Sequence, residues 1–126
     1  MTSEFAGDDR ASRWPRWVYG TGSEPDYRFS FANERTFLAW IRTALALLAG
    51  GVAVDAIDLS IGDTWQAVLA AALIMLGVVC AVASWTRWAR AERAMRNGDV
   101  LPSMSAGVVL TLALIGISAV LFVLIL

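Results

Sequence analysis

The sequence contains no histidine and no lysine, and Cys80 is its only cysteine. One cysteine cannot form an intrachain disulfide, and the position of Cys80 in a long apolar run argues against a reactive thiol. The acidic residues lack the spacing of metal ligands, and the chain has neither a glycine-rich phosphate loop nor a Ser/His/Asp set. The sequence therefore supplies no catalytic residue, metal site or cofactor site, and we expect that the protein is not an enzyme.

Long apolar segments take up about half of the chain. Hydrophobic residues make up 58% of the 126 residues, and the mean hydropathy of +0.62 is too high for an ordinary soluble domain of this size. Three segments, at residues 36–56, 65–85 and 104–126, have about the roughly 20 residues that cross a bilayer. The sequence therefore predicts an all-α membrane protein with three transmembrane helices.

Residues 1–22 are polar and contain no apolar run that would act as a secretory signal. Their arginines alternate with tryptophan and tyrosine residues, a pattern typical of a segment that rests on an anionic membrane surface. The alternative is a disordered tail, which Pro15 and Gly20 favour because they disfavour a long helix. We therefore treat residues 1–27 as a flexible or interfacial tail and residues 28–126 as the transmembrane domain.

The second apolar segment runs into an arginine-rich stretch that contains no helix breaker. The second helix is therefore expected to continue past Trp85 into water until Asn97 and Gly98 end it. Arginines recur there at every third position, as Arg87, Arg90, Arg93 and Arg96. We expect Arg93 and Arg96 on a solvated or lipid-facing flank.

The arginines are unevenly distributed between the two sides of the predicted membrane. The N-terminal segment and the second connection hold nine of the ten, and the Asp-rich first connection and the C-terminus hold none. The positive-inside rule then predicts a cytoplasmic N-terminus, an extension of the second helix into the cytoplasm and an extracytoplasmic C-terminus.

The first apolar helix has two possible beginnings. Ser30 or Asn33 can cap the helix that follows them. The helix can also begin earlier, at about Asp26, in which case the arginines at positions 28, 35 and 42 share a seven-residue spacing on nearly one helix face. Arg42 lies within the apolar part, where an arginine costs about 2.5–3.5 kcal/mol at the bilayer centre, so we expect it to face protein, water or an anion.

Small residues recur at helical spacing on the first two apolar helices. They are Ala39, Thr43, Ala46 and Gly50 on the first, and Gly77, Ala81 and Ser84 on the second. Such faces let helices approach closely, and we expect copies of the chain to pack through them.

Glu34 is predicted to form a structural ion pair. It cannot pair with the adjacent Arg35, because neighbouring residues do not share a helix face. The cytoplasmic end of the second helix offers Arg87 and Arg90. We therefore expect a Glu34–Arg87 or Glu34–Arg90 pair, within one subunit or between two.

The motif Asn33-Glu34-Arg35-Thr36-Phe37-Leu38, together with Trp40 and the Trp-Arg-rich segment at residues 88–98, resembles the small three-span YidH-like membrane proteins. That family is defined by a domain of unknown function. The resemblance covers about residues 28–126 and implies a multi-pass protein of the bacterial inner membrane.

The same domain forms the membrane part of the vacuolar transporter chaperone (VTC) polyphosphate complex. There, several copies surround a path lined by basic residues, and the resemblance places Arg28, Arg35 and Arg90 at those positions. Arg42 stands where the compared VTC chain is not basic. The chain also lacks the polymerase domain of the larger VTC subunits, so it is not expected to make polyphosphate alone.

Two functions are compatible with these features. The first is an oligomeric pore or binding site for phosphate or polyphosphate, lined by Arg28, Arg35, Arg42 and Arg90. The alternative is a non-conducting accessory or scaffold subunit of a larger membrane complex, in which the arginines set topology and contact lipid. Three helices hardly enclose a path alone, so the first function requires a homo-oligomer or mixed oligomer. The expected partners are the bilayer, other subunits and a polyanion, and no nucleic acid.

Overall fold

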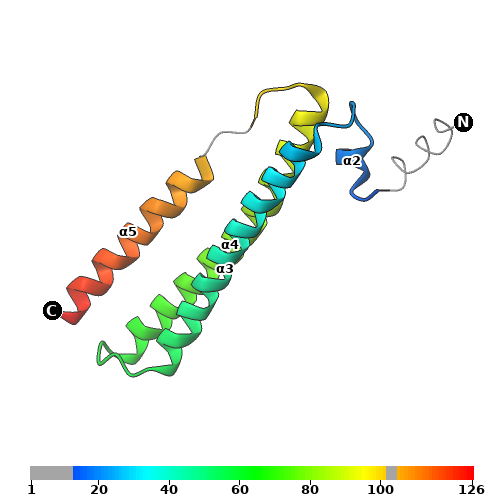
Figure 1. The fold of residues 1–126 in the computed structure, drawn as a ribbon. Coiled ribbons are helices and arrows are strands. Elements are labelled where there is room, and N and C mark those ends of the chain that lie inside the picture. The colour runs from blue at the N-terminus through cyan, green and yellow to red at the C-terminus, as the bar shows by residue number, and fades with distance from the viewer. Residues whose placement is uncertain (1–12, 102–104) are drawn as a thin grey trace, which may run out of the picture. The chain divides into compact units, whose positions relative to one another are not determined.

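The computed structural model of the protein describes residues 13–101 and 105–126. Its helices in these ranges are α2 (Arg16–Tyr19), α3 (Tyr27–Ala56), α4 (Asp63–Asn97) and α5 (Ser105–Ile125), and the described residues form no strand (Figure 1). By length and composition, α3, α4 and α5 are each able to cross a membrane. The all-α fold class with three membrane-length helices is therefore confirmed. Arg10 and the other residues of the predicted tail before position 13 lie outside the described residues.

The helix ends follow from local chemistry. α3 takes the earlier of the two predicted beginnings, because the Asp26 carboxylate accepts the backbone N–H of Arg28 at 3.0 Å and caps the first turn. α4 continues past Trp85 as predicted and ends before Gly98, whose φ of 69° suits a glycine. The expectation that Ser30 or Asn33 caps α3 was wrong, since both residues lie inside the helix.

The chain divides into two compact units, to both of which α3 and α4 contribute. The arginine-rich unit comprises the described residues of Met1–Phe37 and Trp85–Pro102, and the apolar unit those of Leu38–Ser84 and Ser103–Leu126. The segment at residues 13–26 is thus grouped with the start of α3 and the end of α4 in one unit.

In the apolar unit, α3 and α4 pack closely around a small core. Ala44, Leu47 and Cys80 are buried there. A Cβ atom added to Gly77 would lie 3.0 Å from the Ala44 carbonyl oxygen, so this glycine permits close approach of the two helices within one chain. Gly51 has the same role and is even tighter, because its added Cβ would lie 2.6 Å from Ile74 Cγ1.

The predicted small face of α3 is only partly covered within the chain. Ala39 and Ala46 are exposed, and an added Cβ on Gly50 would make only an ordinary contact of 3.9 Å with Leu73 Cδ1. Within one chain, Ala39 and Ala46 therefore stay uncovered, whereas Thr43 and Gly50 are half-buried. At the turn between α3 and α4, the Gln66 amide donates to the carbonyls of Val54 at 2.9 Å and Ile57 at 2.8 Å, which satisfies the end of α3.

Candidate functional site

Arg96 is the centre of the arginine-rich unit. Only 4% of its surface is exposed. Its guanidinium contacts Glu24 Oε1 at 3.3 Å and Glu92 Oε1 at 3.9 Å, and its Cζ lies 4.7 Å from the centroid of the Tyr19 ring. The expectation of a solvated flank was wrong for Arg96, because the N-terminal segment covers this turn of α4 and places Glu24 and Tyr19 on it.

The N-terminal segment is held on α4 by backbone contacts as well. The N–H of Ser23 donates to the Arg96 carbonyl at 3.0 Å, and Gly22, with a φ of 63°, approaches that carbonyl so closely that a Cβ would collide with it. Val18 is fully buried. Trp14 stacks on Trp85 at a centroid distance of 5.7 Å. These contacts make the segment part of the folded unit.

Glu92 is a buried carboxylate, 3% exposed, that joins α3 to α4. It accepts hydrogen bonds from Ser30 Oγ at 2.9 Å and from Asn33 Nδ2 at 3.4 Å. The Asn33 amide also donates to the Trp88 carbonyl at 3.1 Å. Buried polar groups are normally satisfied in this way, so Ser30 and Asn33 serve helix packing here.

The environment of Tyr19 favours its neutral form. Burial raises the pKa of the Tyr19 hydroxyl above its usual value of 10.0, and the carboxylate of Glu92 raises it further. Arg96 and Arg13 oppose this rise because they stabilise the phenolate. The pKa of the Tyr19 hydroxyl is therefore sensitive to the charges of the neighbouring side chains.

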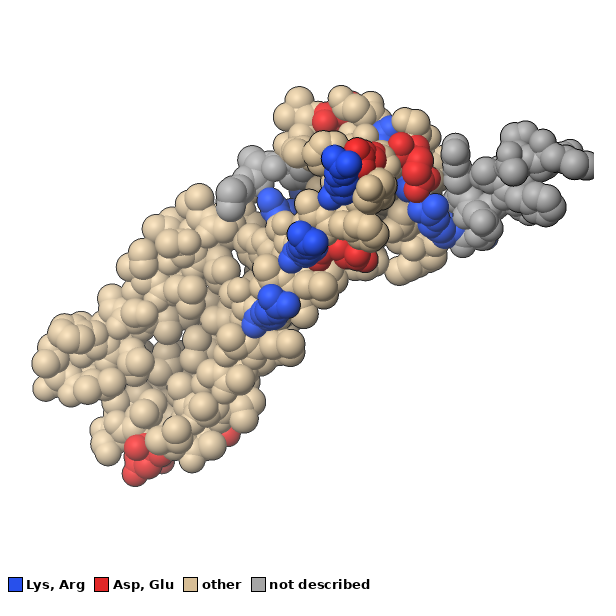
Figure 2. All heavy atoms as spheres, in the orientation of Figure 1, with Lys and Arg blue, Asp and Glu red and all other residues tan. Residues whose placement is uncertain are grey.

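The arginines predicted to bind anions are exposed. Arg28, Arg35 and Arg90 lie in the arginine-rich unit, and Arg42 lies in the apolar unit. In the described parts of the chain, none of the four has a carboxylate within ion-pair distance, and Arg28 lies 6.0 Å from the Tyr27 ring centroid. Figure 2 shows exposed arginines (blue) beside carboxylates (red) on one face of the arginine-rich unit.

Glu34 is not part of an ion pair within the described chain. The ion pairs there are Arg13–Glu24 at 2.9 Å and the two pairs of Arg96. Neither Arg87, which is half-buried, nor Arg90, which is exposed, is paired with Glu34 in one chain. Pairing of Glu34 with an arginine of another copy stays a prediction.

Glu34 instead lines a cavity of about 240 Å³ in the arginine-rich unit, which we call the aromatic pocket. Four aromatic residues and three carboxylates share its lining with Arg13, Pro25 and Ser30. The aromatic residues are Tyr19, Tyr27, Phe31 and Trp88, and the carboxylates are Glu24, Glu34 and Glu92.

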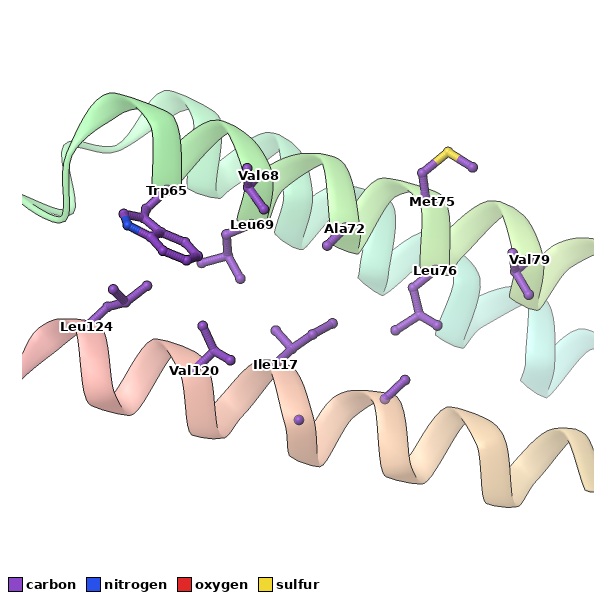
Figure 3. Close-up of a pocket in the computed structure, with 12 residues that line it drawn as sticks. Trp65, Val68, Leu69, Ala72, Met75, Leu76, Val79, Ile117, Val120 and Leu124 are labelled. Carbon is purple, nitrogen blue, oxygen red and sulfur yellow. The ribbon is translucent and has the colours of Figure 1, made fainter.

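A larger cavity of about 590 Å³ lies in the apolar unit between α4 and α5 (Figure 3). Trp65, Leu69 and Leu76 of α4 face Ile117 and Val120 of α5 across it. Its lining carries no charged side chain, so it offers no binding group for an anion. In the described ranges, no group of three or more His, Cys, Asp or Glu side chains is placed to hold a metal ion.

The buried network around Arg96 was not predicted from the sequence. One signal was available, because Glu92 and Arg96 are four residues apart on a helix, a spacing at which opposite charges interact. The contacts from Tyr19, Glu24 and Ser30 join residues more than 60 positions apart and leave no local pattern.

Comparison with known proteins gives a consistent result. The family profile described as "Domain of unknown function (DUF202)" matches residues 28–94. Inner membrane protein YidH of Escherichia coli (strain K12) is 41% identical over 100 residues, which are 79% of this chain and 87% of YidH. An uncharacterized protein of Mycobacterium tuberculosis (strain ATCC 25618 / H37Rv) is 49% identical over 84 residues, 65% of this chain and 68% of that protein. No solved structure matches the chain.

Proposed function

Because this chain belongs to the DUF202 family, we propose that it is a multi-pass protein of the bacterial inner membrane whose copies assemble around an arginine-lined site for phosphate or polyphosphate. The location is supported by three membrane-length helices and by the name of the E. coli relative, inner membrane protein YidH. The arginine distribution supports a cytoplasmic N-terminus and an extracytoplasmic C-terminus.

One observation carries the anion site. Arg28, Arg35, Arg42 and Arg90 are exposed and, like Arg16 and Arg93, have no carboxylate partner in the described chain, whereas Arg13 and Arg96 do. An exposed guanidinium is free to hold phosphate oxygens through two parallel hydrogen bonds. The unpaired arginines therefore supply the donors that a phosphate-bearing ligand needs.

Assembly is supported by the surroundings of Arg42. This residue is exposed on a helix segment otherwise suited to the membrane, where a lone arginine facing lipid is costly. The exposed small residues Ala39 and Ala46 on the same helix let another helix approach. In an oligomer, Arg42 would face other copies, water or an anion.

The resemblance to the VTC membrane domain supports the same ligand class. Arg28, Arg35 and Arg90 correspond to basic positions around its central path. The proposed ligand is therefore phosphate or polyphosphate, and binding is expected to weaken as salt screens the charges.

Polyphosphate binding to the purified full-length protein tests this proposal. Arg35→Ala and Arg90→Ala should each weaken binding about tenfold, since a charged hydrogen bond contributes about 1.5 kcal/mol or more. Arg93→Ala is the matched control, because Arg93 is exposed on the same helix three residues from Arg90. Arg96 is unsuitable as a control, since its removal would disturb the fold.

The outcome also decides between the two functions. Equal effects of Arg35→Ala and Arg93→Ala, or binding that salt does not change, would contradict the anion site. The exposed arginines would then serve topology and lipid contact, as expected for an accessory subunit. If the protein stays monomeric in native-like membranes, the proposed assembly of copies around an arginine-lined site is wrong.

A further inference from the structure

The aromatic pocket has ring faces that suit a cation. Its rings form two edge-to-face pairs, Tyr19–Trp88 with centroids 6.2 Å apart and Tyr27–Phe31 with centroids 6.0 Å apart. In such a pair the edge of one ring covers at most one face of the other. Uncovered faces carry negative potential and attract ammonium and guanidinium groups.

The protein's own arginines already use some of these faces. Arg13 lies 5.4 Å and Arg96 4.7 Å from the Tyr19 ring centroid, and Arg28 lies 6.0 Å from that of Tyr27. Among the described residues, no arginine lies over Phe31 or Trp88. Trp88 also packs against Trp85 and Phe37, with centroid distances of 5.3 and 6.4 Å, so the exposed ring of Phe31 is the aromatic wall that is open to a cation from outside.

The carboxylates that line the pocket are not fully neutralised. Glu24 pairs with Arg13 and Arg96, and Glu92 pairs with Arg96. Glu34 is exposed and forms no ion pair among the described residues, so its charge is not offset by an arginine of the same chain. One negative charge is left at the pocket, and its carboxylate can accept the N–H bonds of a primary ammonium.

The charge of the whole unit selects the kind of cation. Residues 1–37 and 85–102 contain nine arginines and eight carboxylates, a net charge of +1, which does not attract a free polycation. A group that carries an ammonium and a phosphate avoids this conflict. Its ammonium would meet Glu34 and the rings, and its phosphate would meet an exposed arginine such as Arg28, whose guanidinium lies 6.0 Å from the ring centroid of Tyr27 in the pocket lining.

We propose that the aromatic pocket binds the ammonium of a phosphoethanolamine group, whose phosphate is held by the exposed arginines of the same unit. This group occurs as a phospholipid headgroup and as a soluble phosphate ester. The proposal does not depend on polyphosphate binding, because the expected preference for an ammonium group comes from Glu34 and the ring faces and not from the arginines alone.

Titration calorimetry of the full-length protein in maltoside micelles tests the pocket. Dihexanoyl phosphatidylethanolamine should bind about tenfold more tightly than dihexanoyl phosphatidylglycerol, which has the same phosphate but no ammonium. Glu34→Gln should remove this preference, whereas Asp99→Asn, which neutralises an exposed carboxylate of the same unit outside the pocket lining, should keep it. Phe31→Leu should weaken binding of the ethanolamine lipid about two- to fivefold.

Equal binding of the two lipids by the unmodified protein, or a preference that survives in Glu34→Gln, would overturn the proposal. Tighter binding of spermidine than of the ethanolamine lipid would also overturn it in favour of a plain cation site. Soluble phosphoethanolamine and glycerol phosphate identify the source. If the protein also binds soluble phosphoethanolamine more tightly than glycerol phosphate, the ligand is a soluble ester. If it prefers the ethanolamine compound only among the lipids, the ligand is the membrane headgroup.

Discussion

The guanidinium carbon of Arg96 lies 4.7 Å from the centroid of the Tyr19 ring, so an N-terminal aromatic side chain covers a charged group near the end of α4. Arg96 is thereby removed from water, and the carboxylates of Glu24 and Glu92 provide the opposite charge. Covering a charge is favourable only when such partners are present. The N-terminal segment and the end of α4 are therefore expected to fold together.

Replacing Arg96 with alanine should destabilise the protein by about 3 kcal/mol, because it leaves the buried Glu92 carboxylate without its ion-pair partner. Residues 13–24 should then detach, and trypsin should cleave faster at Arg16. Thermal unfolding and limited proteolysis in detergent measure the two effects. Arg93→Ala is the control, and an equal loss of stability in that variant would contradict the special role of Arg96.

The sequence predicted the helices well and the role of Arg96 poorly, for a physical reason. Membrane-length apolar runs and the Gly98 stop are local signals, so the extension of α4 and the fold class were found. Arg93 and Arg96 belong to the same three-residue repeat, although only Arg96 has a carboxylate, Glu92, four residues before it; the larger difference is what lies over each arginine. Arg96 is covered by Tyr19, which lies 77 positions away in the sequence, and no periodicity in the sequence indicates this contact.

The ionisation of Tyr19 should respond to neighbouring charges in opposite directions. In a Tyr27→Phe background Tyr19 is the only tyrosine, and the absorbance of its phenolate should appear above the usual pKa of 10.0. Arg13→Gln should raise this pKa further, and Glu34→Gln should lower it. Both side chains are exposed, so neither change should unfold the unit.

The same shift predicts how stability depends on alkaline pH. Because the pKa of Tyr19 is higher in the folded protein than in the unfolded chain, the folded state retains its proton longer. This contribution is fully present below pH 10 and is lost as the pH rises through the folded pKa. Stability that does not fall there, relative to a Tyr19→Phe variant, would contradict the burial of the hydroxyl.

Two adjacent glycines should respond differently to alanine. Gly51→Ala should destabilise the protein by about 1–3 kcal/mol, because its Cβ would lie 2.6 Å from Ile74 Cγ1 and 2.9 Å from the Ala70 carbonyl oxygen. Gly50→Ala should be neutral or stabilising by up to about 1 kcal/mol, since its Cβ meets only Leu73 Cδ1 at 3.9 Å. Thermal unfolding in detergent compares them. Similar effects would show that α3 and α4 do not approach as closely as described.

Arg42 provides the test of assembly, because one chain leaves this arginine exposed on a membrane-length helix. If copies surround a common path, residues at position 42 of neighbouring chains lie near one another. If the protein is monomeric, the Arg42 side chain extends to the lipid headgroups, and positions 42 of different chains are not close to one another. The protein's single cysteine makes the two cases separable, since Cys80 is removable by substitution with serine.

An Arg42→Cys change in a Cys80→Ser background should therefore give disulfide-linked dimers when native membranes are oxidised. Val109→Cys in the same background is the control, because Val109 is 62% exposed on a different helix, α5, which carries no arginine. Cross-linking at position 42 well above that at 109, and independent of expression level, is the expected result. Equal cross-linking at both positions would indicate random collisions in the bilayer, and the shared arginine-lined path would then be wrong.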